Sequence, residues 1–165
     1  SLAVASVARH LLLDPRQAQQ AFLAGMLHDV GRLVLAASAP EDLITLPCIE
    51  QPSLSGDDPD PGEPAVAVTH AEIGAYLLGV WGLPPTIVEA VAHHHHPERV
   101  QAHDFDVLGA VYVAENLLRE QNTQDHHCRE ATEARLLEYL GSLSEARTPV
   151  DTLADLRERA AASLE

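Results

Sequence analysis

Apolar side chains recur along most of the chain at the three- and four-residue spacing of an α-helix. The first thirteen residues are apolar and rich in alanine, and Asp14 followed by Pro15 is typical of an N-cap and first helical position. The same periodicity predicts further helices over residues 16–28, 32–39, 65–80, 86–95 and 105–120, and weaker ones over 130–140 and 150–163. We therefore expect an all-α fold, a compact helical bundle.

The periodicity stops between residues 40 and 64. Residues 41–46 could form one more turn of helix, and residues 47–64 hold five prolines, two glycines and several aspartates, which is typical of a loop. A polar break over 121–127 divides the domain into a helical core, 1–120, and a C-terminal helical extension, 121–165. Because the sequence opens in mid-helix without a methionine, we expect a piece of a longer protein with a truncated N-terminus.

The composition agrees with helices packed on helices. Hydrophobic residues make up 46% of the chain, mostly Ala and Leu, and aromatic residues only 4%, so strong strand formers are sparse. Cys48 and Cys128 lie far apart without CxxC spacing, which indicates free thiols in a reducing, cytoplasmic compartment. No run of 18 apolar residues and no signal peptide is present, so we expect no membrane partner.

The charge of the chain bears on its partners. Twenty-five acidic residues face ten basic ones, all arginine, for a formal net charge of −15. So acidic a chain repels phosphate backbones, which argues against a nucleic-acid partner. A single small phosphorylated ligand, held by a metal ion and one or two arginines, remains compatible with this charge.

The first candidate site is the doublet His28–Asp29, at the end of an apolar helical segment and just before Gly31. An imidazole and a carboxylate beside a core are costly unless something binds them, and a divalent metal ion would satisfy both. Taken alone, the doublet is more simply explained as a capping histidine beside a solvated aspartate.

The second candidate is His70, within the predicted helix 65–80. Ile73, Gly74 and Leu77 follow at +3, +4 and +7, so His70 shares the inward-facing stripe of that helix. A single inward histidine is more often a hydrogen-bonded core residue than a metal ligand.

The third candidate is the run from His93 to His96, at a helix end before Pro97. Neighbouring residues of a helix point about 100° apart, so at most two of the four can face one site. The alternative is a solvated helix terminus, where imidazolium suits the helix dipole.

Together these motifs resemble the HD superfamily, and most closely its HDOD branch of bacterial signalling output domains, which is related to the HD-GYP metal-dependent phosphohydrolases. The resemblance covers roughly residues 1–118 in register, and the turn from Trp81 to Pro84 is its most HDOD-like feature. The matching stretches are residues 24–35, 68–84, 87–95 and 111–115.

The resemblance implies a bundle of the HD-domain type with one or two divalent ions, of Fe, Mn, Zn or Ni. In register, the residues that match the family's metal ligands are His28, Asp29, His70, His94 and His95, with Glu115 in the final ligand position. Asp29 would bridge two ions, and Arg32 stands where a basic residue contacts substrate phosphate in catalytic relatives; arginine can do this bidentately.

Several departures bear on activity. Catalytic HD proteins have Asp where this chain has Glu115, whose extra methylene displaces the oxygens. The family's first histidine would precede Ser1, and the GYP signature is absent from residues 97–101. Many HDOD domains have lost ligands and are thought to act without catalysis.

Three functions therefore stay open. The favoured one is a bacterial signal-transduction output domain with an HD-type metal site, working with other signalling domains of a larger regulatory protein. The alternative is an active metal-dependent phosphohydrolase, a phosphodiesterase for a cyclic nucleotide or dinucleotide, with Asp29 and Arg32 as catalytic residues and metal-activated water. The third is a helical protein-interaction domain in which the histidines are incidental.

Overall fold

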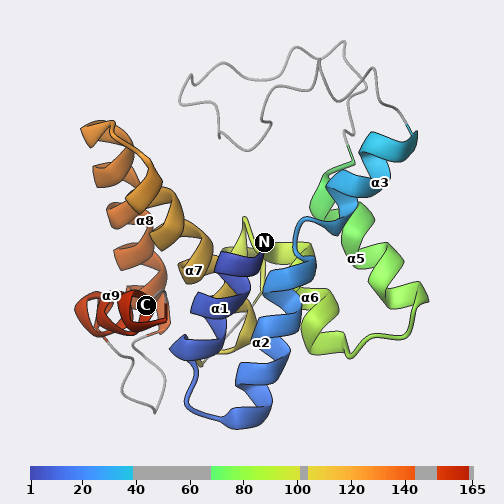
Figure 1. Ribbon diagram of the computed structural model, residues 1–165, viewed down its shortest axis with the longest axis horizontal. Helices are drawn as coiled ribbons and strands as arrows, with labels where there is room; N and C mark the ends of the chain where they lie inside the picture. Colours follow the sequence, from blue (N-terminus) through green and yellow to red (C-terminus); the bar gives the residue numbers. More distant parts are fainter. Residues whose placement is uncertain (39–67, 101–103, 144–151, 164–165) are drawn as a thin grey trace.

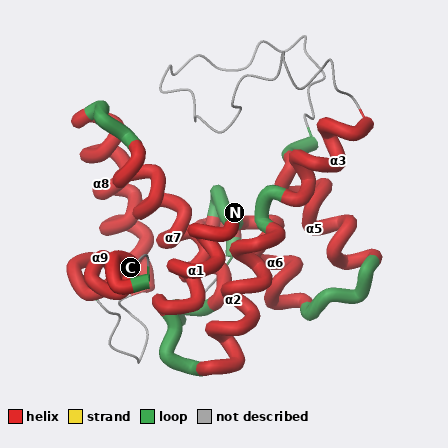
Figure 2. The backbone as a smooth tube through the Cα atoms, viewed as in Figure 1, coloured by secondary structure: helices red, strands yellow, loops and turns green. Residues whose placement is uncertain are grey.

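The fold was analysed in a computed structural model that describes residues 1–38, 68–100, 104–143 and 152–163. Over these ranges the chain is helical, and no strand occurs within them (Figure 2). This confirms the all-α prediction. The elements are α1 (Leu2–Leu11), α2 (Pro15–Leu27), α3 (Val30–Ser38), α5 (His70–Val80), α6 (Pro85–His93), the 3-10 helix η1 (Pro97–Arg99), α7 (Val107–Asn122), α8 (His126–Leu143) and α9 (Leu153–Ala162).

Polar caps begin several of these helices, and the one at Asp14 was predicted from the sequence. The Asp14 carboxylate accepts hydrogen bonds from the amides of Arg16 and Gln17, and Pro15 opens α2. The Asp106 carboxylate accepts from the amide of Gly109 at the start of α7. These carboxylates satisfy amides that have no partner inside the helix.

Helix α7 forms the centre of the main hydrophobic core. Its residues from Val107 to Ala114 are all buried, and α1, α2, α6, α8 and α9 pack around it. Figure 1 shows α1 and α2 at the centre of the molecule, with α8 and α9 on one side. Arg159 of α9 donates to the carbonyl of Leu11, at the end of α1, at 3.2 Å. The two ends of the described chain therefore meet in one core.

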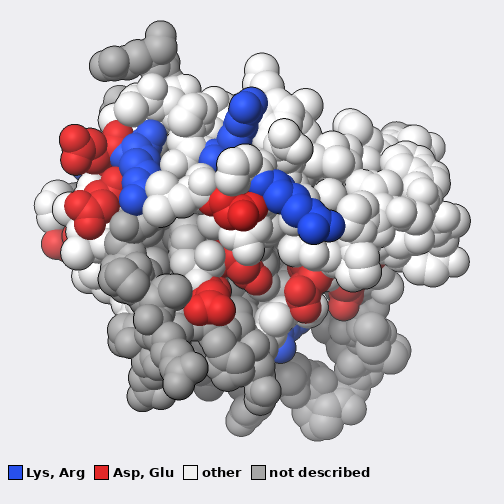
Figure 3. Space-filling model, turned by 90° about the horizontal axis from the view of Figure 1, so that it is seen from below, with Lys and Arg blue, Asp and Glu red and all other residues white. Residues whose placement is uncertain are grey.

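A second, smaller hydrophobic cluster joins α5 and α6 through Ala75, Leu78 and Val91. The turn between these helices contains Gly82, whose φ of 76° suits glycine. Figure 3 shows a side of the molecule almost without charged side chains, where α5 and α6 lie in Figure 1. Tyr76 of α5 and Trp81, the C-cap of that helix, are exposed.

The structure corrects some of the expected helix boundaries. The helix expected from residue 65 begins at His70, because Thr69 caps it, and Val68 lies exposed before it. The expected polar break at 121–127 is shorter, since α7 continues to Asn122 and α8 begins at His126. The expected helical turn at 41–46, the loop at 47–64 and Cys48 lie outside the described residues.

The buried face of α2 also differs from the expected apolar pattern. Its buried residues are Ala18, Ala21, Ala24 and Gly25, while Leu23 and Met26 are exposed. Small side chains face inward because α1 lies very close: a Cβ on Gly25 would fall 2.7 Å from the Cα of Ala5. None of the helices in the described ranges is long and apolar enough to cross a membrane.

Candidate metal centre

The corner between α2 and α3 presents His28 and Asp29 together. His28 is the C-cap of α2 and is buried, and its Nδ1 donates to the carbonyl of Gly25 at 2.8 Å. The carbonyl can only accept, so this bond places the imidazole hydrogen on Nδ1 and turns Nε2 toward Asp29. Nε2 lies 3.0 Å from Oδ2 of Asp29.

Close packing of α3 on α5 brings His70 to this corner. A Cβ on Gly31 would overlap the carbonyl oxygen of His70 and lie 2.9 Å from the amide nitrogen of Gly74. Glycine is therefore required at this position. The sequence suggested that Gly31 interrupts the helix, but α3 begins at Val30 and continues through Gly31. His70 is buried, and its Nε2 lies 3.6 Å from Oδ1 of Asp29.

A capping box determines where α5 begins. The hydroxyl of Thr69 accepts from the amide of Glu72, and the carboxylate of Glu72 accepts from the amide of Thr69. His70 is the first residue of the helix, so its position follows directly from this cap. Glu72 itself is exposed, and its role is structural.

The end of α6 supplies His94 and His95. Nδ1 of His94 donates to the carbonyl of Val91 at 2.7 Å, and its Nε2 is buried with no hydrogen-bond partner in the described ranges. Nε2 of His95 lies 3.3 Å from Nε2 of His70. One nitrogen from each of His70, His94 and His95 lies within 4.8 Å of the other two.

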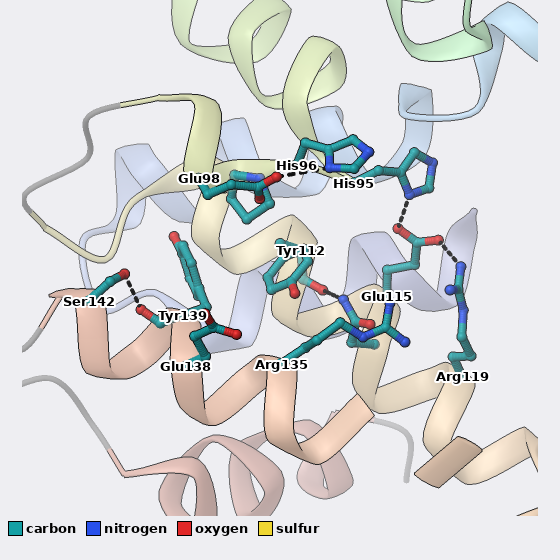
Figure 4. A pocket seen from close by; sticks show the side chains of 12 residues that line it. His95, His96, Glu98, Tyr112, Glu115, Arg119, Arg135, Glu138, Tyr139 and Ser142 are labelled. Atoms are coloured by element: carbon teal, nitrogen blue, oxygen red, sulfur yellow. Dashed lines mark hydrogen bonds and ion pairs between the residues drawn. The ribbon is translucent and has the colours of Figure 1, made fainter. Parts of the chain in front are cut away.

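Two charged residues lie around these histidines. Glu115 of α7 places Oε2 3.7 Å from Nδ1 of His95 and accepts from Arg119 at 3.1 Å (Figure 4). It thus faces His95 on the nitrogen opposite His70. On the other side, Nε of Arg32 lies 2.8 Å from Oδ1 of Asp29.

The structure therefore brings all seven candidate residues into one continuous cluster, named here the histidine cluster. Its members are His28, Asp29, Arg32, His70, His94, His95 and Glu115. His96 instead pairs with Glu98 at 2.9 Å, outside the cluster. As expected from helix geometry, two of the four consecutive histidines share the site.

The electrostatics of the cluster set the protonation of its members. Burial alone would lower the pKa of His28, but its hydrogen bond and proximity to Asp29 raise the pKa above the ordinary value. Burial alone would raise the pKa of Asp29, but His28 and then Arg32 hold it well below its usual range. Burial, reinforced by neighbouring imidazoles, lowers the pKa of His94 to about 3. His94 is therefore neutral near pH 7.

This donor set fits a divalent metal ion. Neutral imidazoles and a carboxylate are the usual ligands of Zn and of the first-row metals near it. Within the described chain the buried Nε2 of His94 has no hydrogen-bond partner, and its lone pair could bind a cation. A carbonyl bond on the opposite ring nitrogen is typical of ligating histidines. His70, His94 and His95 could thus hold a metal ion.

Sequence reasoning missed three contributors to the cluster. Thr69 is one, although its spacing to Glu72 is a recognisable capping-box signal. The carbonyls of Gly25 and Val91, which orient His28 and His94, have no sequence signal because any residue supplies a carbonyl.

Comparison with known proteins identifies the family of the chain. A relative described as an uncharacterized protein of Treponema pallidum (strain Nichols) is 33% identical over 75 residues, which are 45% of this chain and 14% of that protein. This chain thus spans only a small part of that relative's length. No solved structure matches. The sequence model of the HDOD domain matches residues 1–97, more than half of the chain, and the chain therefore belongs to the HDOD family of HD-related domains.

Proposed function

We propose that this chain is a signalling output domain that binds a divalent metal ion in the histidine cluster. The observation that carries the metal site is Nε2 of His94, a buried nitrogen that has no hydrogen-bond partner among the described residues and lies beside two further imidazoles. A buried polar atom left unpaired costs about 1–3 kcal/mol. A bound cation would remove that cost.

Five inner residues are the proposed ligands: His28, Asp29, His70, His94 and His95. The Nδ1 bonds of His28 and His94 to carbonyls hold their Nε2 atoms toward the cluster. We assign Glu115 a positioning role, because it contacts His95 on the nitrogen opposite His70. A mixture of imidazole and carboxylate suits one or two ions of Fe, Mn, Zn or Ni.

Membership of the HDOD family supports the output role. The small share of the Treponema relative that aligns is consistent with a module of a larger regulatory protein, which would act on other signalling domains of its parent chain. The free Cys128 suits a reducing cytoplasm.

Metal analysis of the purified chain tests the site. After treatment with a chelator, the protein is dialysed against Zn²⁺, Mn²⁺, Fe²⁺ or Ni²⁺, and bound metal is measured by plasma mass spectrometry. We expect at least one equivalent per chain, lost in His94→Gln. His127→Gln, at an exposed histidine of α8, is the matched control and should retain the metal. Absence of metal under all four conditions would refute the metal site.

A second candidate, phosphohydrolase activity, is favoured by the position of Arg32. Its half-exposed guanidinium lies against the partly exposed Asp29, so both are accessible to a phosphate ester. A divalent ion supplies Lewis acidity to such a reaction. Arg32 would hold the phosphate and neutralise its developing charge.

The activity assay separates the two candidates. Metal-loaded protein is incubated with bis(4-nitrophenyl) phosphate and with cyclic nucleotides and dinucleotides. Turnover that is lost in Asp29→Asn and weakened in Arg32→Gln, but kept in Arg16→Gln on the exposed surface of α2, would establish an enzyme. Metal binding without turnover leaves the output domain as the function.

A further inference from the structure

A cavity of about 380 Å³ lies on the other side of the His95–Glu115 pair from His70. It is lined by the end of α6, η1, α7 and α8, so much of its wall lies beyond the matched residues 1–97 (Figure 4). Its volume is within the range of small-molecule sites.

Two tyrosines form an aromatic wall of this cavity. Tyr112 of α7 and Tyr139 of α8 meet edge to face with ring centroids 5.1 Å apart, and each is only 8% exposed. Among the described residues neither hydroxyl has a hydrogen-bond partner, and that of Tyr139 is fully buried. The Tyr139 hydroxyl lies next to Gly109 inside the protein, so the tyrosines offer the cavity their rings, a surface that suits a flat aromatic ligand.

Two arginines add positive charge at the same cavity. Arg135 donates through Nε to the carbonyl of Ala131, and no ion pair of its guanidinium occurs within the described chain. Figure 4 shows Arg135 and Arg119 extending from neighbouring helices toward Glu115. Arg119 is paired with Glu115, so the guanidinium of Arg135 is the positive group that favours an anionic ligand.

Three carboxylates also line the cavity, and two of them are already paired. Glu115 is held by Arg119 and His95, and Glu98 by His96. Glu138 is exposed, where water screens its charge. The terminal nitrogens of Arg135 are thus the group with capacity to bind an anion.

We propose that this cavity binds a small aromatic anion, with its ring against Tyr112 and Tyr139 and its phosphate or carboxylate at Arg135. This site goes beyond the proposed metal centre and does not depend on it. The two share only the His95–Glu115 pair as a common wall.

Fluorescence titration of the full chain, kept metal-free with chelator, tests the proposal. The probes are 1-naphthyl phosphate and 1-naphthoate, which separate phosphate from carboxylate preference. Neutral 1-naphthol represents the aromatic ring alone, and inorganic phosphate represents the anionic group alone. We expect saturable 1:1 binding of at least one anion with a Kd of about 10 µM to 1 mM, as for an efficient small ligand. Each half should bind at least about tenfold more weakly, since it loses the ring contact or the charge-assisted hydrogen bond.

Two arginines of α8 supply matched variants. Arg135→Gln should weaken binding about tenfold, since it removes a charge-assisted contact. Arg129→Gln, at an exposed position that does not line the cavity, should leave Kd unchanged. Unfolding curves confirm that both variants fold. No saturable binding of either anion, or equal weakening in both variants, would overturn the proposal. Because the assay excludes metal, this result is independent of whether the histidine cluster binds an ion.

Discussion

The Nδ1 atom of His95 lies 3.7 Å from Oε2 of Glu115, while its Nε2 lies 3.3 Å from Nε2 of His70. The carboxylate therefore meets the outer side of the imidazole and the other histidines meet its inner side. Glu115 also accepts from Arg119, which lines the neighbouring cavity. The role proposed for Glu115 is therefore to orient His95, and not to bind the ion itself.

Glu115→Gln tests this positioning role. The amide keeps the shape of the side chain but removes its charge, so we expect metal affinity to fall about 10- to 100-fold with unchanged stoichiometry. Competition with a chromophoric chelator measures the affinity. Glu158→Gln, on the exposed surface of α9, is the control and should leave it unchanged. A reduced number of bound ions in Glu115→Gln would instead identify Glu115 as a direct ligand.

Thr69→Ala tests whether the capping box of α5 positions His70. Loss of the cap should lower the free energy of unfolding by about 1 kcal/mol and weaken metal binding, since His70 opens the helix. Thr152→Ala removes the equivalent capping box of α9, remote from the cluster. Chemical denaturation should show a similar loss of stability in both variants. If both variants weaken metal binding, or if neither variant does, the cap at Thr69 has no specific role in placing His70.

Gly31→Ala tests the close approach of α3 and α5. The added methyl would overlap the His70 carbonyl oxygen, so we expect a loss of about 2 kcal/mol or more in unfolding free energy. Gly79→Ala is the matched helical control, with nothing within 4 Å of its Cβ position. It should gain about 0.5–1 kcal/mol from helix propensity. Thermal and urea unfolding measure both variants. If Gly31→Ala and Gly79→Ala change the free energy of unfolding equally, the packing argument is wrong.

His94 makes the metal-free protein sensitive to acid. The unfolded chain takes up a proton on His94 near pH 6.5, but the folded chain does so only near its lowered pKa of about 3. The unfolded state binds more protons in this window, so the His94 contribution is present above pH 6.5 and is lost as the pH falls toward 3. The slope from this one group is at most about 1.4 kcal/mol per pH unit.

His94→Leu should therefore flatten the decline of stability between pH 6.5 and 3. Urea unfolding at several pH values, with chelator present, measures the slope. His127→Gln removes an exposed histidine and should retain the slope of the parent protein. An unchanged slope in His94→Leu would mean that the folded chain takes up a proton on His94 at the same pH as the unfolded chain.

Much of the fold is readable from local sequence. The cap at Asp14 and the apolar periodicity place helices because these signals act between residues three or four positions apart. The Thr69 capping box is a signal of the same range that was missed. The inward face of α2 was not readable in this way. Its larger residues Leu23 and Met26 face outward, because the backbone of α1 leaves room only for alanine and glycine.

The sequence by itself determined the helical class, the family and the identity of the histidine-cluster residues, because periodicity, caps and motif spacing are local properties. Only the tertiary structure decided how these residues meet. The overlap that any side chain on Gly31 would make with α5, the carbonyl partners of His28 and His94, and the side of His95 that Glu115 contacts all depend on helices distant in the chain. The tyrosine-lined cavity likewise arises from the packing of α7 against α8 and is not encoded in any local motif.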